Sequence, residues 1–126
     1  MWIYVILSSV KDIIPFDDFA NVDLRVGLVE KAGTLENSEK LIRLTVDFGP
    51  PEASQEKKIK KNVLTGLRQW YTPDDFKGGY FVFVLNLAPK EMAGEESEGM
   101  LLCVSGEEKP LPLRAPEGSK AGDSLR

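Results

Sequence analysis

The stretch Leu41-Ile42-Arg43-Leu44-Thr45-Val46-Asp47-Phe48 decides the fold, because its side chains alternate between two faces along its whole length. Ile42, Leu44, Val46 and Phe48 point one way, and Leu41, Arg43, Thr45 and Asp47 point the other. A repeat of two residues, with one face uniformly apolar, is the pattern of a β-strand that covers a hydrophobic core. The pattern predicts that the even-numbered residues of this strand are buried.

A second alternating stretch comes before it. Leu24, Val26 and Leu28 share one face, while Arg25, Val29 and Lys31 share the other, as expected of a half-buried strand. The turn-rich residues 33–38 join the two stretches, so we predict a long antiparallel hairpin. Gly27 lies in mid-strand, where a residue without a side chain suits a bend or a bulge.

Three more strands are predicted further along the chain. Residues 57–66 form the third, with a basic start, and the apolar runs 80–85 and 100–104 form the fourth and fifth. Between the third and fourth, Thr72 followed by Pro73 is the start of a short helix that the glycines at 78–79 close. Cys103 falls in the last strand, and we expect it to be buried in the core.

These elements predict an all-β fold: a five-stranded barrel of the oligonucleotide/oligosaccharide-binding (OB) type, with a short helix between strands three and four. A chain of 126 residues with 42% hydrophobic content suits one domain with one core. Residues 1–15 are expected to be an N-terminal extension or edge strand, and residues 105–126 a C-terminal extension. Within the latter, residues 116–123 are turn-rich and could pack as a final hairpin.

Composition argues against catalysis. The chain has no histidine, which removes the commonest general base and metal ligand, and its single cysteine excludes an internal disulfide or a zinc–cysteine cluster. The Glu95–Glu98 run lacks the residue spacing of a calcium loop. We therefore expect no enzyme activity, no metal and no cofactor.

Charge and hydropathy favour a cytoplasmic protein. The net charge is −4, so any contact with a polyanion must be local. No stretch is long enough to span a membrane, and the apolar segment 2–7 lacks the basic start of a secretion signal.

The segment Asn86-Leu87-Ala88-Pro89-Lys90-Glu91-Met92-Ala93-Gly94 follows the fourth strand directly, and Ser97-Glu98-Gly99-Met100 comes soon after it. Loops of this kind, carried on a rigid barrel, are where small β-proteins place their binding sites. We expect this loop to be the working surface of the molecule.

This loop resembles the signature loop of the tRNA-binding domain family, which includes free-standing bacterial tRNA-binding proteins, the C-terminal domain of methionyl-tRNA synthetase and the endothelial monocyte-activating polypeptide type. The resemblance extends, in order, over residues 18–27, 38–41, 64–67, 71–73 and 115–123. It implies a largely sequence-tolerant tRNA-binding module, a homodimer, and a role auxiliary to an aminoacyl-tRNA synthetase or to tRNA handling.

The loop residues suit RNA chemically. Asn86 offers a donor and an acceptor to a base edge, Lys90 a charge to a phosphate, and Ser97 a hydroxyl to a phosphate or ribose. Glu98 could accept from a base or from backbone amides of its own loop, and Met100 could pack under a base. The structural alternative is that Asn86 ties the loop, Ser97 caps it and Met100 is core.

Additional phosphate contacts are expected from basic residues of neighbouring strands, provided that their faces converge beside the loop. These residues are Lys40, Arg43, Lys58 and Lys60. The alternative is that the lysines only keep a strand edge solvated.

The sequence also departs from the family. Members that bind tRNA well carry the pattern Pro-Arg-Lys-Met-Arg-Gly, where this chain has Pro89-Lys90-Glu91-Met92-Ala93-Gly94, so two positive charges are missing. Six glutamates and no basic residue lie between positions 91 and 108 inclusive, which predicts modest, salt-sensitive binding. The alternative function is that of a protein-binding export chaperone of the same fold, which the acidic balance and the apolar start at residues 2–7 favour.

Overall fold

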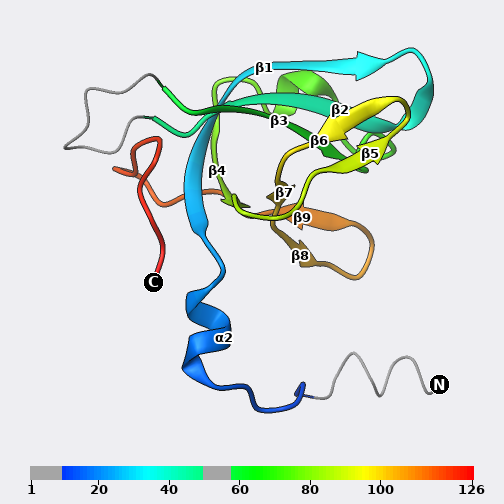
Figure 1. Ribbon diagram of the computed structural model, residues 1–126. Helices are drawn as coiled ribbons and strands as arrows, with labels where there is room; N and C mark the ends of the chain where they lie inside the picture. The colour runs from blue at the N-terminus through cyan, green and yellow to red at the C-terminus, as the bar shows by residue number, and fades with distance from the viewer. Residues whose placement is uncertain (1–9, 50–57) are drawn as a thin grey trace.

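The computed structural model describes residues 10–49 and 58–126, and most of its regular structure is β (Figure 1). Five strands form one antiparallel sheet in the order β3-β2-β1-β4-β7. Their bounds are Leu24–Leu35 for β1, Ser38–Asp47 for β2, Lys60–Thr65 for β3, Tyr80–Val84 for β4 and Met100–Leu101 for β7. The predicted β fold with five principal strands is confirmed.

Smaller elements complete the chain. Two hairpins pair β5 (Lys90–Met92) with β6 (Glu95–Ser97) and β8 (Cys103–Ser105) with β9 (Pro110–Pro112). A 3-10 turn, η1 (Pro73–Asp75), lies between β3 and β4 as predicted, and the backbone N–H of Thr72 donates to Asp75 Oδ2 at 2.8 Å. The short helix α2 (Phe16–Ala20) was not predicted.

The prediction for β2 is confirmed. Ile42, Leu44, Val46 and Phe48 are all at most 1% exposed and belong to the main hydrophobic core. Phe48 packs edge-on against Phe83 of β4, with ring centroids 5.4 Å apart, which is a favourable aromatic geometry.

The prediction for β1 is wrong about which face meets the core. Val29 is fully buried in the core cluster, whereas Leu24 and Leu28 are only partly buried. A Cβ on Gly27 would lie 2.4 Å from Val46 Cγ1, so Gly27 lets the core side chains close over the strand instead of forming the expected bulge. The irregularity falls after it, between Val29 and Lys31, and it turns Lys31 to the outer face opposite Thr45.

The C-terminal segment lies along the free edge of β1 (Figure 1). Val26 donates to the carbonyl of Asp123 and accepts from Gly122, both at 2.8 Å. The expected hairpin over residues 116–123 is wrong, because this stretch consists of turns and its regular pairing is made by Ser124 with Arg25. The C-terminal extension is therefore part of the folded body.

The two edges of the sheet approach each other. The backbone N–H of Glu98 donates to the carbonyl of Asn62 at 2.8 Å, which brings the end of β6 beside β3. The Glu98 carboxylate accepts in turn from the N–H of Asn62 at 3.0 Å, so a side chain continues the ladder where the backbone pairing stops.

Two further predictions need correction. Cys103 is exposed because it lies in the β8–β9 hairpin outside the main sheet, although partial burial still raises the pKa of its thiol. The predicted N-terminal edge strand falls largely on residues 1–9, outside the described residues, and residues 10–15 form no strand. No helix in the described part of the chain is long and apolar enough to cross a membrane.

Candidate nucleic-acid interface

Two hollows meet at Arg43, between the β1–β2 turn and the β5–β6 hairpin, which lie side by side at the right of Figure 1. One has a volume of about 360 Å³ and the other about 160 Å³. We call them together the hairpin groove. Its lining residues are Lys31, Ala32, Gly33, Thr34, Leu35, Glu36, Asn37, Arg43, Thr45, Ala93 and Glu95.

The wall of the groove is a tight hairpin. Ala93 and Gly94 both have positive φ, 50° and 83°, as a two-residue turn of type I′ requires. Gly94 adopts this conformation freely, whereas Ala93 adopts it at a cost. The turn sets Met92 opposite Glu95 and Lys90 opposite Ser97, so the register of the hairpin directs Glu95 toward β2.

Arg43 is held by Glu95 through both arms of its guanidinium. Its Nε donates to Glu95 Oε1 at 2.7 Å, and its Nη2 donates to Glu95 Oε2. This hydrogen bonding lowers the pKa of the Glu95 carboxyl and raises the pKa of Arg43, because each partner favours the charged form of the other. The groove thus has an arginine at its centre that already carries a carboxylate.

Ser97 and Glu98 have structural partners. Ser97 is buried, and its hydroxyl accepts from the N–H of Leu64 and donates to the carbonyl of Gly99, both at 3.0 Å. The Glu98 carboxylate binds the Asn62 amide, and its Oε2 also lies 3.8 Å from Lys61 Nζ. Both side chains join the hairpin to β3.

Asn86 ties its loop to the segment before β1. Its Oδ1 accepts from the N–H of Asp23 at 2.8 Å, and its Nδ2 donates to the carbonyl of Asn21 at 2.7 Å. These bonds are the loop-tying arrangement that the sequence left open as an alternative.

The predicted lysines do not all converge on the loop. Lys58 pairs with Asp47 at 3.5 Å and Lys60 with Glu30 at 3.1 Å, both at the end of β2 away from Arg43. Lys40 is exposed but does not line the groove. Lys31 and Lys90 are exposed and have no acidic partner within residues 10–49 and 58–126.

A second, more apolar hollow of about 420 Å³ lies on the other side of the β5–β6 hairpin, and we call it the loop pocket. It is lined by Leu64, Leu87, Ala88, Lys90, Met92, Ser97, Gly99 and Met100. Met100 is 44% exposed, so it belongs to the surface and not to the core. Lys90 and Met100, two of the predicted site residues, are thus brought together.

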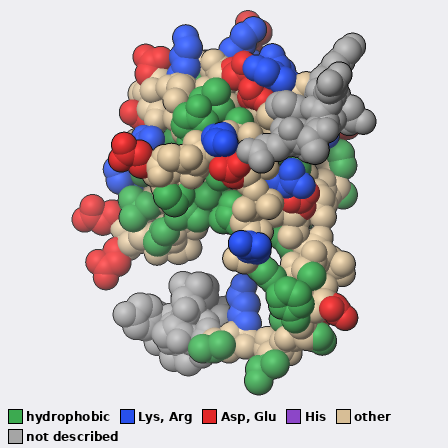
Figure 2. All heavy atoms as spheres, turned by 90° about the vertical axis from the view of Figure 1, so that its left-hand side faces the viewer, with side chains coloured by type: hydrophobic (Ala, Val, Ile, Leu, Met, Phe, Trp, Pro, Cys, Tyr) green, Lys and Arg blue, Asp and Glu red, His purple; other side chains and the backbone are tan. Residues whose placement is uncertain are grey.

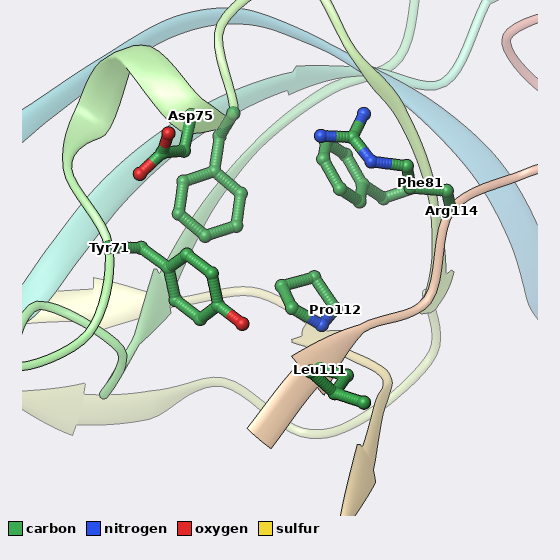
Figure 3. A pocket seen from close by; sticks show the side chains of 7 residues that line it. Tyr71, Asp75, Phe81, Leu111, Pro112 and Arg114 are labelled. Carbon is green, nitrogen blue, oxygen red and sulfur yellow. The ribbon is translucent and has the colours of Figure 1, made fainter. Parts of the chain in front are cut away.

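The remaining surface does not offer a rival basic patch in the views available. On the face in Figure 2, lysine and arginine side chains are interspersed with aspartate and glutamate. Figure 3 shows a pocket of about 230 Å³ between η1, β4 and β9, where the guanidinium of Arg114 lies over the Phe81 ring. None of the predicted site residues lines that pocket. The described residues contain no group of three acidic or cysteine side chains placed to hold a metal ion.

Comparison with known proteins identifies the family. Residues 24–124 match the family described as "Putative tRNA binding domain". The chain belongs to the tRNA-binding domain family. The resemblance seen in the sequence is confirmed, and it covers the whole sheet and both hairpins.

Solved members of the tRNA-binding domain family have the same fold. A methionyl-tRNA-synthetase-related protein from Pyrococcus horikoshii is 32% identical, with a TM-score of 0.80 over 92% of this chain and 100% of that one. The chaperone CsaA from Bacillus anthracis is 28% identical, with a TM-score of 0.74 over 91% of this chain and 100% of that one. The C-terminal domain of Plasmodium vivax p43 is 29% identical, with a TM-score of 0.74 over 86% and 61%.

Sequence reasoning missed two residues of this tRNA-binding domain. Lys31 reaches the groove only because of the irregularity in β1, which no local pattern announces. Glu95 was read only as part of an acidic run, and its partner Arg43 lies 52 positions away in the chain. The missing basic residues of the hairpin were the one available signal that its charges act differently here.

Proposed function

We propose that this protein binds folded tRNA through the hairpin groove and the adjoining loop pocket. The observation that carries the proposal is the position of Arg43, Lys31 and Lys90 on the two sides of one hairpin, in a chain of the tRNA-binding domain family. Phosphates bind the three cations, and an unstacked base packs on Met100 beside Lys90. The protein has no catalytic role in this proposal.

The same geometry explains why binding should be modest and dependent on salt. Each phosphate contact releases counterions, and few cations in this region are without a carboxylate partner. Lys40, Lys58 and Lys60 contribute long-range attraction rather than direct contacts. Asn86, Ser97 and Glu98 act as positioning residues, because their polar atoms already hold the loop and the hairpin in place.

We further propose that the sheet closes into an OB-type barrel, with Glu98 and Asn62 joining its two edges, and that residues 1–126 form one domain. The strand order and the position of η1 between β3 and β4 support this assignment.

A homodimer is proposed as well, with a cytoplasmic role auxiliary to an aminoacyl-tRNA synthetase. The support for the dimer is the exposed apolar surface around α2, where Ile13 is 99% and Phe16 75% exposed. In Figure 1 this helix projects away from the sheet, as an arm that a second copy could cover. The likeness to a methionyl-tRNA-synthetase-related protein supports the synthetase connection.

Polypeptide binding is the second candidate. The loop pocket favours it, because most of its lining is apolar and its volume of about 420 Å³ could hold a hydrophobic side chain. The likeness to a CsaA chaperone points the same way. The basic side chains around the hairpin favour RNA, which we therefore place first.

The test is a salt titration of binding to bulk tRNA, with an unfolded polypeptide as competitor. Lys90→Ala should weaken binding of all tRNA species alike and reduce the slope of log K against log salt by about one. Lys77→Ala, which removes an exposed lysine outside the groove and the loop pocket, is the control. Salt-independent binding, or displacement of tRNA by equimolar polypeptide, would favour the chaperone function instead.

A further inference from the structure

The Arg43–Glu95 pair differs from the other ion pairs of this surface. Lys58, Lys60 and Lys61 each make one contact with a carboxylate, at 3.1 to 3.8 Å. Arg43 instead makes two parallel hydrogen bonds to the two oxygens of Glu95. This two-pronged geometry is also the one by which an arginine recognises a phosphate. The carboxylate thus occupies the donors that a phosphate would need.

The position of the pair makes this occupation matter. Arg43 lines both hollows of the hairpin groove, with Lys31 and Thr45 in one and the β1–β2 turn in the other. Glu95 reaches it from the hairpin that forms the opposite wall, so the pair bridges the groove. A chain of phosphates following the groove would meet this bridge before it met the guanidinium.

We propose that Glu95 is an internal competitor for the phosphate site at Arg43, and that its carboxylate sets the affinity of the groove for tRNA. This inference rests on the tRNA-binding function proposed above. The bound backbone takes one phosphate to Arg43, and Glu95 turns away into solvent. The side chain of Glu95 is about one-third exposed, so this movement needs no rearrangement of the core.

The neighbouring glutamate provides a matched control. Glu96 follows Glu95 in β6 and is exposed, and its carboxylate has no ion-pair partner within the described residues. Removing the charge of either residue changes the net charge and the long-range field equally. Only removal of the Glu95 charge releases the fork of Arg43.

The experiment measures tRNA affinity against salt for the wild type, Glu95→Gln, Glu96→Gln and Glu95→Gln/Arg43→Gln. We expect Glu95→Gln to bind about threefold to fivefold tighter than Glu96→Gln, the range typical of releasing an exposed ion pair. Its slope of log K against log salt should steepen by about 0.9, for one added phosphate contact. The double variant should lose both effects.

The outcomes separate the two proposals. If the wild type binds tRNA with a salt slope but Glu95→Gln is no tighter than Glu96→Gln, the competitor role is wrong while the tRNA function stands. If neither the wild type nor Glu95→Gln binds tRNA, the function itself is wrong. Thermal unfolding of each variant checks that the hairpin remains folded.

Discussion

At the residue scale, Arg43 illustrates what a single sequence does and does not reveal. The alternation of β2 placed its side chain on the outer face, and the structure agrees. Its partner was beyond reach, because Glu95 sits on a hairpin whose approach to β2 depends on the whole sheet. Residue types therefore predicted a cation at the site but not its occupied state.

The Arg43–Glu95 pair should make stability depend on pH in a predictable direction. The pKa of Glu95 is lowered below its ordinary value of 4.5, so the stabilisation is present above that pH and is lost as pH falls through the folded-state pKa. Urea unfolding at pH 7, 5 and 3 should show the wild type more stable than Glu95→Gln at pH 7 and 5, with little difference at pH 3. A difference that persists unchanged at pH 3 would contradict this.

Ala93 is the residue whose backbone suits its side chain least. Its φ of 50° is favourable for Asn or Gly in a type I′ turn, so Ala93→Asn should stabilise the protein by about 0.5–1 kcal/mol. Ala88→Asn is the control, since Ala88 is an exposed loop alanine with ordinary φ. Equal or lower stability of Ala93→Asn in chemical denaturation would show that the turn is relaxed with alanine.

At the scale of elements, β2 and β1 show the limit of pattern reading. A strand that pairs regularly keeps its alternation, so the buried face of β2 could be read directly. In β1, the irregularity after Val29 and the close packing over Gly27 depend on neighbours in β2 and β4. Apolar side chains on both faces of β1 are also buried by different partners, the core and the C-terminal segment.

Gly27→Ala should test this packing. The added Cβ would lie within 3.0 Å of Val46, Phe48 and Phe83, all of them core side chains with little room to move. We expect a loss of about 1–3 kcal/mol in the free energy of unfolding, as for other overpacked cores. Gly66→Ala serves as a control, because no atom lies within 4 Å of its modelling position for a Cβ. A neutral Gly27→Ala would mean that β1 runs differently.

At the scale of the whole molecule, the family's order of motifs made the sheet predictable, whereas the termini were not. The C-terminal segment pairs with β1 through backbone bonds, which leave no trace in side-chain alternation. Residues 10–22 are fully exposed on this single chain, although six of their side chains are large and apolar. A partner surface is the simplest physical reason for such an arm.

The proposed dimer makes a direct prediction. Phe16→Asp/Phe19→Asp should halve the mass measured by light scattering, because it places charges in the apolar surface of α2. Asp17→Ser, on the same helix, should leave the mass of the dimer unchanged. A monomeric wild type, or a double variant that remains dimeric, would show that α2 does not form the interface.

The most direct test of the account is an NMR titration of the isotope-labelled protein with bulk tRNA at low salt, followed by addition of salt. The account predicts that shifts concentrate in residues 31–45 and 87–100, around the hairpin groove and the loop pocket, and reverse as salt is raised. Shifts that centre instead on η1 and the β8–β9 hairpin, or that persist at high salt, would contradict tRNA binding through this groove.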